Sequence, residues 1–172
     1  MLKKNYRALS RRPESPAAKA LAARGVELVK GSLTDKASLL VALEGIPAAF
    51  LITVPTGSGE TQAEEQEGKT FLDAARGTRL PFLVFSSVDG AERQTGVPFL
   101  ETKRDLEEYL RESGIHHTIL RPVAFFDNFP KQSGMASFFL LGMFDAALRG
   151  KKLQLVACTD IGNLHLARKG SR

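Results

Sequence analysis

The sequence has a single cysteine, Cys158, and no tryptophan among its 172 residues. One thiol cannot form a disulfide within the chain, so nothing in the composition indicates an oxidising compartment. No stretch approaches the roughly 20 consecutive apolar residues that a transmembrane helix needs, and the first residues lack the apolar segment of a signal peptide. We therefore expect a cytoplasmic protein that does not enter a membrane.

Histidine is also scarce, with three in the chain. His116, His117 and His165 have no acidic residue or cysteine at the spacing of a metal site, so no metal is expected. The net charge of +5 is unevenly distributed, because residues 1–30 carry eight Lys or Arg against two acids and residues 149–172 carry six against one. Without interleaved aromatic residues or a helix-turn-helix pattern, these basic ends indicate a solvated surface, and direct contact with nucleic acid is not expected.

The length and the 43% hydrophobic content fit one domain with a substantial core. Short apolar segments predict strands at residues 6–10, 26–30, 48–53, 80–87 and 118–122. Helices are predicted between them, at residues 17–24, 34–43, 62–77 and 102–113. This alternation is typical of a doubly wound, mainly parallel α/β sheet. Because the third strand segment is apolar throughout, we expect it to lie in the centre of the sheet.

Residues 80–87 and the helix that follows them form the predicted centre of the fold. The apolar run is unbroken, which indicates a strand buried on both faces, and Ser86 and Ser87 place hydroxyl groups where that strand ends. Ligands of open α/β sheets bind at the carboxyl ends of such strands. The amphipathic helix at 102–113 then brings Lys103 close to this edge.

The glycine-rich turn that usually receives the pyrophosphate of a dinucleotide is missing. Nothing of this kind precedes Tyr6, the start of the first predicted strand. Gly57 and Gly59 follow a strand but have neither the spacing nor an immediate helix, so we interpret them as part of a loop. The fold is therefore expected to be incomplete, with the first strand–helix unit missing.

Several segments, in their order and spacing, resemble the NmrA-like family of atypical short-chain dehydrogenase/reductases. These segments are residues 7–13, 17–21, 25–35, 83–87, 103–110, 119–122 and 125–129. The resemblance covers nearly the whole chain and implies a Rossmann-type domain at 1–162, followed by a polar basic tail at 163–172. It also implies NADP(H) as the cofactor, a redox-sensing or regulatory role, and the nucleus as a second location beside the cytoplasm.

Four residues are candidate cofactor contacts through this resemblance. Arg11, with Arg12 beside it, matches the arginine that pairs with the 2′-phosphate of NADP, and a guanidinium suits a phosphate because it donates two parallel hydrogen bonds. Thr53 matches the end of the strand that passes the nicotinamide ribose. Lys103 matches the lysine that holds the ribose hydroxyls. Taken alone, each residue also fits an ordinary surface or strand-end position.

The proton donor of the related dehydrogenases is missing. In that superfamily a tyrosine four residues before the lysine supplies it, and Phe99 stands at this position. Because a phenyl ring has no proton to donate, we assign no catalytic residue. The sequence predicts weak or lost NADP(H) binding and impaired catalysis.

Two other functions stay open. One is an NAD(P)H-dependent reductase that acts on a quinone, if the natural chain begins further upstream. The other is a protein-interaction module without a cofactor, in which exposed sheet edges and a helix at residues 135–148 bind a partner or a second copy of the chain. The missing glycine turn favours the regulatory and the interaction hypotheses over the reductase.

Overall fold

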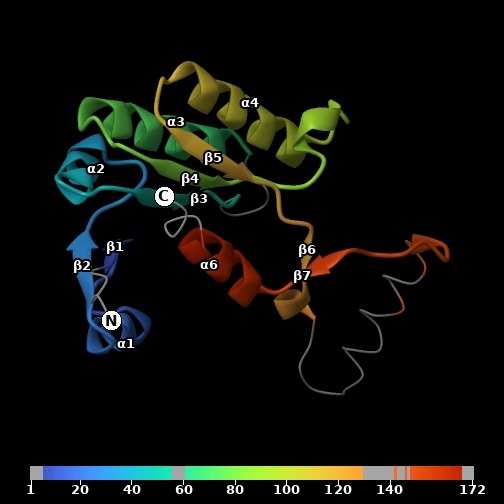
Figure 1. Ribbon diagram of the computed structural model, residues 1–172, viewed down its shortest axis with the longest axis horizontal. Coiled ribbons are helices and arrows are strands. Elements are labelled where there is room, and N and C mark those ends of the chain that lie inside the picture. The colour runs from blue at the N-terminus through green and yellow to red at the C-terminus, as the bar shows by residue number, and fades with distance from the viewer. Residues whose placement is uncertain (1–5, 56–60, 130–141, 143–145, 147, 168–172) are drawn as a thin grey trace. The chain divides into compact units, whose positions relative to one another are not determined.

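The computed structural model describes residues 6–55, 61–129, 142, 146 and 148–167 (Figure 1). The chain forms two compact units, residues 1–120 and 121–172. The division expected from the sequence, a domain at 1–162 and a tail at 163–172, stays a prediction, although a helix runs across its boundary. The predicted helix at 135–148 and the predicted glycine-containing loop at 56–60 fall largely or wholly outside the described residues.

Among its described residues, the first unit contains five strands in two sheets, and the strands within each sheet are parallel (Figure 1). One sheet pairs β1 (Tyr6–Ser10) with β2 (Val26–Lys30). The other has the order β3 (Ala49–Ile52), β4 (Leu83–Ser86), β5 (His117–Leu120). All five predicted strands are present, and the predicted α/β fold with parallel pairing is confirmed. The sheets are small, and within the described residues β1 and β3 do not pair with each other.

Local capping signals fix the ends of the first two helices. The Ser15 side chain accepts a hydrogen bond at the start of α1 (Pro16–Ala23), and Asp35 accepts two at the start of α2 (Lys36–Leu43). A side-chain oxygen at this position satisfies backbone N–H groups that the helix itself leaves without a partner. The helices predicted at residues 17–24 and 34–43 thus begin within two residues of their predicted starts.

The position of β3 corrects a prediction. Its apolar run at 48–53 suggested a central strand, but among the described residues β3 lies at the edge of its sheet and pairs with β4 alone. Its side chains alternate, since Leu51 is 3% exposed and Ile52 is 54% exposed. Although the residues of β3 are apolar on both faces, only one face of this strand packs against the core. β4 is the central strand, and its four residues are all buried, as predicted.

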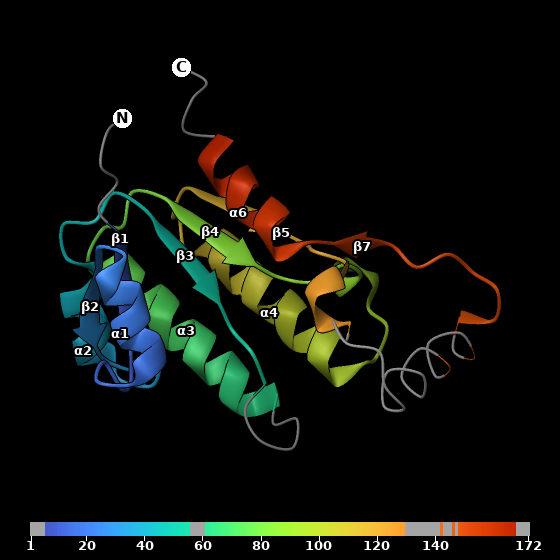
Figure 2. The same cartoon turned by 90° about the horizontal axis from the view of Figure 1, so that it is seen from below.

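Two long helices cover one face of the three-stranded sheet, as Figures 1 and 2 show for α3 (Thr61–Gly77) and α4 (Pro98–Glu112). They approach closely because Gly68 has no side chain. A Cβ atom at this glycine would lie 2.5 Å from Leu106 Cδ2, a distance that real Cβ contacts do not reach. The core between the helices and the sheet includes Phe71, Leu72, Leu83, Phe85, Leu106 and Leu110.

The second unit contains short elements. β6 (Ala124–Phe125) pairs in parallel with β7 (Leu155–Val156), and a 3-10 turn, η2, spans Phe126–Asn128. In α6 (Cys158–Ala167), the backbone N–H of Cys158 donates to Asp127 Oδ2 at 2.7 Å. No helix in the described part of the chain is long and apolar enough to cross a membrane.

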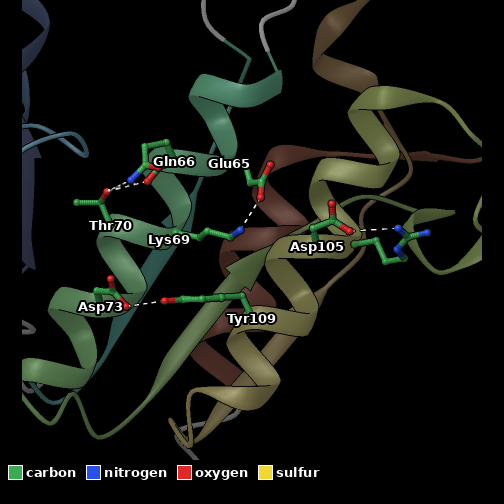
Figure 3. Close-up of polar contacts among 8 residues, drawn as sticks. Glu65, Gln66, Lys69, Thr70, Asp73, Asp105 and Tyr109 are labelled. Atoms are coloured by element: carbon green, nitrogen blue, oxygen red, sulfur yellow. Dashed lines mark hydrogen bonds and ion pairs between the residues drawn. The ribbon is translucent and has the colours of Figure 1, made fainter.

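A polar contact joins α3 and α4 at the surface of the first unit (Figure 3). The Tyr109 hydroxyl donates to Asp73 Oδ1 at 2.7 Å. Because this hydrogen bond holds the phenol proton, and partial burial also disfavours the phenolate, the pKa of Tyr109 is raised above its ordinary value of 10.0. The contact therefore stabilises the protonated tyrosine in the folded state.

We expect Tyr109→Phe to lower the free energy of unfolding at neutral pH by about 1 kcal/mol, the typical net value of one hydrogen bond. Because the folded pKa is raised, this contribution is fully present below the ordinary tyrosine pKa and is lost as the pH rises through the raised value. Urea unfolding of wild type and variant at pH 7 and at about pH 11 tests this. The difference should shrink at the higher pH, whereas Tyr6→Phe, at an exposed tyrosine, should change little.

Candidate functional site

A buried polar cluster lies where β3 ends. Lys103 comes from α4, Glu64 from α3, and Thr53 follows the last residue of β3. Their side chains are almost fully removed from solvent, with exposed fractions of 4% for Lys103, 0% for Glu64 and 2% for Thr53. We call these three residues the Lys103 cluster. The structure thus brings together two of the four predicted site residues, Thr53 and Lys103.

Lys103 is held by two hydrogen bonds and one ion pair within the protein. Its Nζ donates to the carbonyl oxygen of Thr53 at 2.6 Å and to Thr53 Oγ1 at 2.9 Å, and it forms an ion pair with Glu64 Oε1 at 2.7 Å. The ammonium is therefore paired within the chain. The ammonium also lies 5.6 Å from the centre of the Phe85 ring, within reach of a cation–π interaction.

The Thr53 hydroxyl completes the cluster by donating to Glu64 Oε1 at 2.9 Å. Two buried oxygens nearby in the fold lack a hydrogen-bond partner among the described residues, Glu64 Oε2 and Ser87 Oγ. Ser87 follows β4, the strand that pairs with β3, and its backbone N–H donates to the Leu120 carbonyl. The carboxylate of Glu64 therefore has a spare acceptor.

The sequence pattern left Glu64 without a role, although a signal was present. The polar run at 62–68 suggested only the start of a helix. In α3, however, Glu64 shares one face with Gly68, Phe71 and Ala75, at helical spacings of four, seven and eleven residues, and all four are buried. A carboxylate in line with an apolar face indicates a buried and therefore paired acid.

The two arginines stand apart from the cluster. Arg11 and Arg12 follow β1 and are exposed, and the backbone N–H of Arg12 donates to Ser10 Oγ at 3.2 Å. Among the described residues neither guanidinium makes an ion pair. The arginines follow a strand of the two-stranded sheet, and Thr53 follows a strand of the other sheet. Among the described residues, no hydrogen bond or ion pair joins either arginine side chain to the Lys103 cluster.

A proton donor at the sequence-predicted position is missing from the fold as well. Phe99 lies in the first turn of α4, one turn before Lys103, and its side chain is 38% exposed. Within the residues described, no group of three or more His, Cys, Asp or Glu side chains lies close enough to hold a metal ion. The arrangement offers charge and hydrogen bonds, and the one carboxyl group of the Lys103 cluster, Glu64, is paired with the lysine.

Comparison with known proteins assigns nearly the whole chain to one family model. The model described as the NmrA-like family matches residues 2–166. The NmrA-like family domain-containing oxidoreductase FrzB of Cladobotryum sp is 31% identical over 139 residues, which are 73% of this chain and 40% of that protein. The photosystem II assembly factor Ycf39 of Cyanophora paradoxa is 33% identical over 105 residues, 59% of this chain and 33% of that protein.

A solved structure supports the same fold. The NADPH-dependent quinone oxidoreductase QOR2 of Escherichia coli, in complex with NADPH, superposes with a TM-score of 0.62 at 27% identity, over 72% of this chain and 41% of that one. The chain therefore spans well under half the length of these similar proteins.

We expect Thr53→Val to destabilise the fold by about 1–3 kcal/mol, because it removes a hydroxyl that accepts from Lys103 and donates to Glu64 in a buried site. Thr53→Ser keeps the hydroxyl and should cost clearly less. Thermal and urea unfolding of both variants test this expectation. Equal stability of Thr53→Val and wild type would mean that the hydroxyl contributes nothing to the cluster.

Proposed function

Because this chain belongs to the NmrA-like family, we propose that it is a regulatory or redox-sensing member with weak or lost NADP(H) binding and impaired catalysis. The single observation that carries the proposal is the state of Lys103. Its ammonium donates two hydrogen bonds to Thr53 and forms a buried ion pair with Glu64. The ribose of a nucleotide would have to compete with these buried contacts for the lysine.

The residues present fit NADP(H) only in part. Arg11 and Arg12 are exposed and have the chemistry to pair with a 2′-phosphate. Lys103, however, is engaged by Thr53 and Glu64. Contacts at the edge of the nucleotide are therefore retained, while contacts at its centre are not. This supports weak binding with a preference for the phosphorylated dinucleotide.

Impaired catalysis follows from the missing acid. Carbonyl reduction by the tyrosine and lysine pair needs a proton donor within hydrogen-bonding distance of the substrate. Phe99 cannot donate a proton, and the acid in the same turn of α4, Glu101, is paired with Arg104 and accepts from the backbone N–H of Gly96. The similarity to a protein named as an assembly factor, at 33% identity, supports a role in the family other than reduction.

A quinone-type reductase is the enzymatic alternative. A quinone takes its proton from solvent after hydride transfer, so the missing tyrosine does not exclude this chemistry. The likeness to a quinone oxidoreductase at 27% identity favours it. It requires a firmly bound NADPH, which the partial fit described above does not support.

We also propose a cytoplasmic location, with the nucleus as a second compartment, supported by the single cysteine.

The proposal is tested by calorimetric titration of NADPH and NADH. We expect weak or undetectable binding, and a dissociation constant for NADPH in the low micromolar range or tighter would contradict it. Where binding is measurable, NADPH should be preferred, and Arg11→Ala should reduce the preference about five- to tenfold, the effect of losing one exposed charge-assisted contact. Arg24→Ala, at an exposed arginine that ends α1, is the matched control.

The interaction module remains a second candidate, favoured by the edges of the two sheets. β1 and β3 each have one partner strand among the described residues. Three large apolar side chains are exposed along β3 and just beyond its end, those of Phe50, Ile52 and Val54, with exposed fractions of 36%, 54% and 60%. An edge strand with apolar side chains is a template for pairing with another chain. We propose that the chain associates with itself or a partner here.

We expect the purified chain to sediment as a species larger than its 18.7 kDa monomer. Ile52→Lys should shift it toward the monomer, because a charge on an edge strand opposes pairing. Val41→Lys, at an exposed apolar residue of α2, is the control and should leave association unchanged. Sedimentation velocity measures both, and a monodisperse wild-type monomer would contradict this candidate.

A further inference from the structure

We propose that Glu64 holds the ammonium group of Lys103 in a buried ion pair and so prevents Lys103 from contacting a nucleotide. Lys103 is then a residue that positions α3 and α4 against β3, and not a cofactor contact. This inference deepens the proposed function, on which it rests, by naming the residue that withholds the lysine.

The first step is the set of contacts that the ammonium makes. Nζ donates two hydrogen bonds to Thr53 and forms an ion pair with Glu64 Oε1, at distances of 2.6–2.9 Å. A ribose hydroxyl that accepted a hydrogen bond from Lys103 would compete with these contacts. The carbonyl of Thr53 and its hydroxyl are fixed at the end of β3, so displacement would most directly affect Glu64.

The second step is charge. Glu64 is fully buried, and without Lys103 it would lose its charged partner in the interior. Removing one partner of a buried ion pair is strongly destabilising, because the remaining charge is left without solvent or partner. A neutral hydroxyl cannot compensate for that loss. The exchange of Glu64 for a sugar is therefore unfavourable, and the pair stays closed.

The third step is a comparison on the same helix. Glu65, the next residue of α3, also pairs with a lysine, but its partner is Lys69 and both side chains are about one third exposed (Figure 3). An exposed pair of this kind contributes little to stability and its lysine remains open to solvent. The two neighbouring glutamates thus provide a matched pair, one buried and one exposed.

Chemical labelling of lysines tests whether Lys103 is withheld. The whole chain is treated with an acetylating reagent, and the rate at each lysine is followed by peptide mass spectrometry. We expect Lys103 to react at least tenfold more slowly than Lys69. Glu64→Gln should raise the Lys103 rate at least tenfold, whereas Glu65→Gln should leave it unchanged. Rapid labelling of Lys103 in the wild-type chain would overturn the inference.

Because Glu64→Gln can fail to fold, a second set of variants is needed. Glu64→Leu and Lys103→Met each leave one buried charge alone, and the double variant removes both. We expect each single variant to melt at a lower temperature than the double variant, the signature of a coupled buried pair. If Lys103→Met alone melts like the wild type, the pair does not position the helices and the inference is wrong.

NADPH titration separates this inference from the proposed function. Tight binding by the wild type would refute weak or lost binding, yet the inference would survive if the double variant Glu64→Leu/Lys103→Met bound with unchanged affinity. A tenfold or greater loss of affinity in that variant would make Lys103 a cofactor contact and overturn the inference. If the wild type does not bind, the labelling and melting results decide it.

Discussion

The buried ion pair between Glu64 and Lys103 determines how three elements of the first unit meet. Two charges removed from water are tolerated only when their geometry is close, and here Thr53 bonds to both. Neither α3 nor α4 can rotate or slide along the sheet without breaking this arrangement. The glycine at the helix crossing and the bond from Tyr109 to Asp73 lie on the same two helices. Apolar packing and polar contacts therefore specify one position for the pair.

Elements with local signals were predicted well from the sequence. Ser15 and Asp35 mark helix starts through bonds to residues two or three positions away, and the apolar run of β4 reflects burial on both faces. The position of β3 was not predictable in this way, since an apolar run does not tell which strands pair with it. β6 and β7 have two residues each, too few for any periodicity to appear.

The site shows the same division between local and distant information. A lysine in the first turns of a helix is ordinarily a surface residue, and only the family resemblance singled out Lys103. Its burial depends on Glu64, 39 positions earlier in the chain, and on Thr53, 50 positions earlier. The periodicity of α3 placed Glu64 on the buried face, but its partner could not be read from the sequence. Pairing of charges across elements is a property of the fold.

Separation of the charged groups bears most directly on function. The arginines that suit a 2′-phosphate are exposed and follow a strand of the two-stranded sheet. The lysine that suits a ribose is buried and paired at the end of β3, in the three-stranded sheet. Reduction needs the nicotinamide held rigidly beside the substrate, because a small displacement of reacting atoms costs much of the rate. Recognition of a phosphate by exposed arginines has no such requirement. A chain built this way is better suited to respond to a dinucleotide than to transfer hydride from it, which is why we favour regulation over reduction.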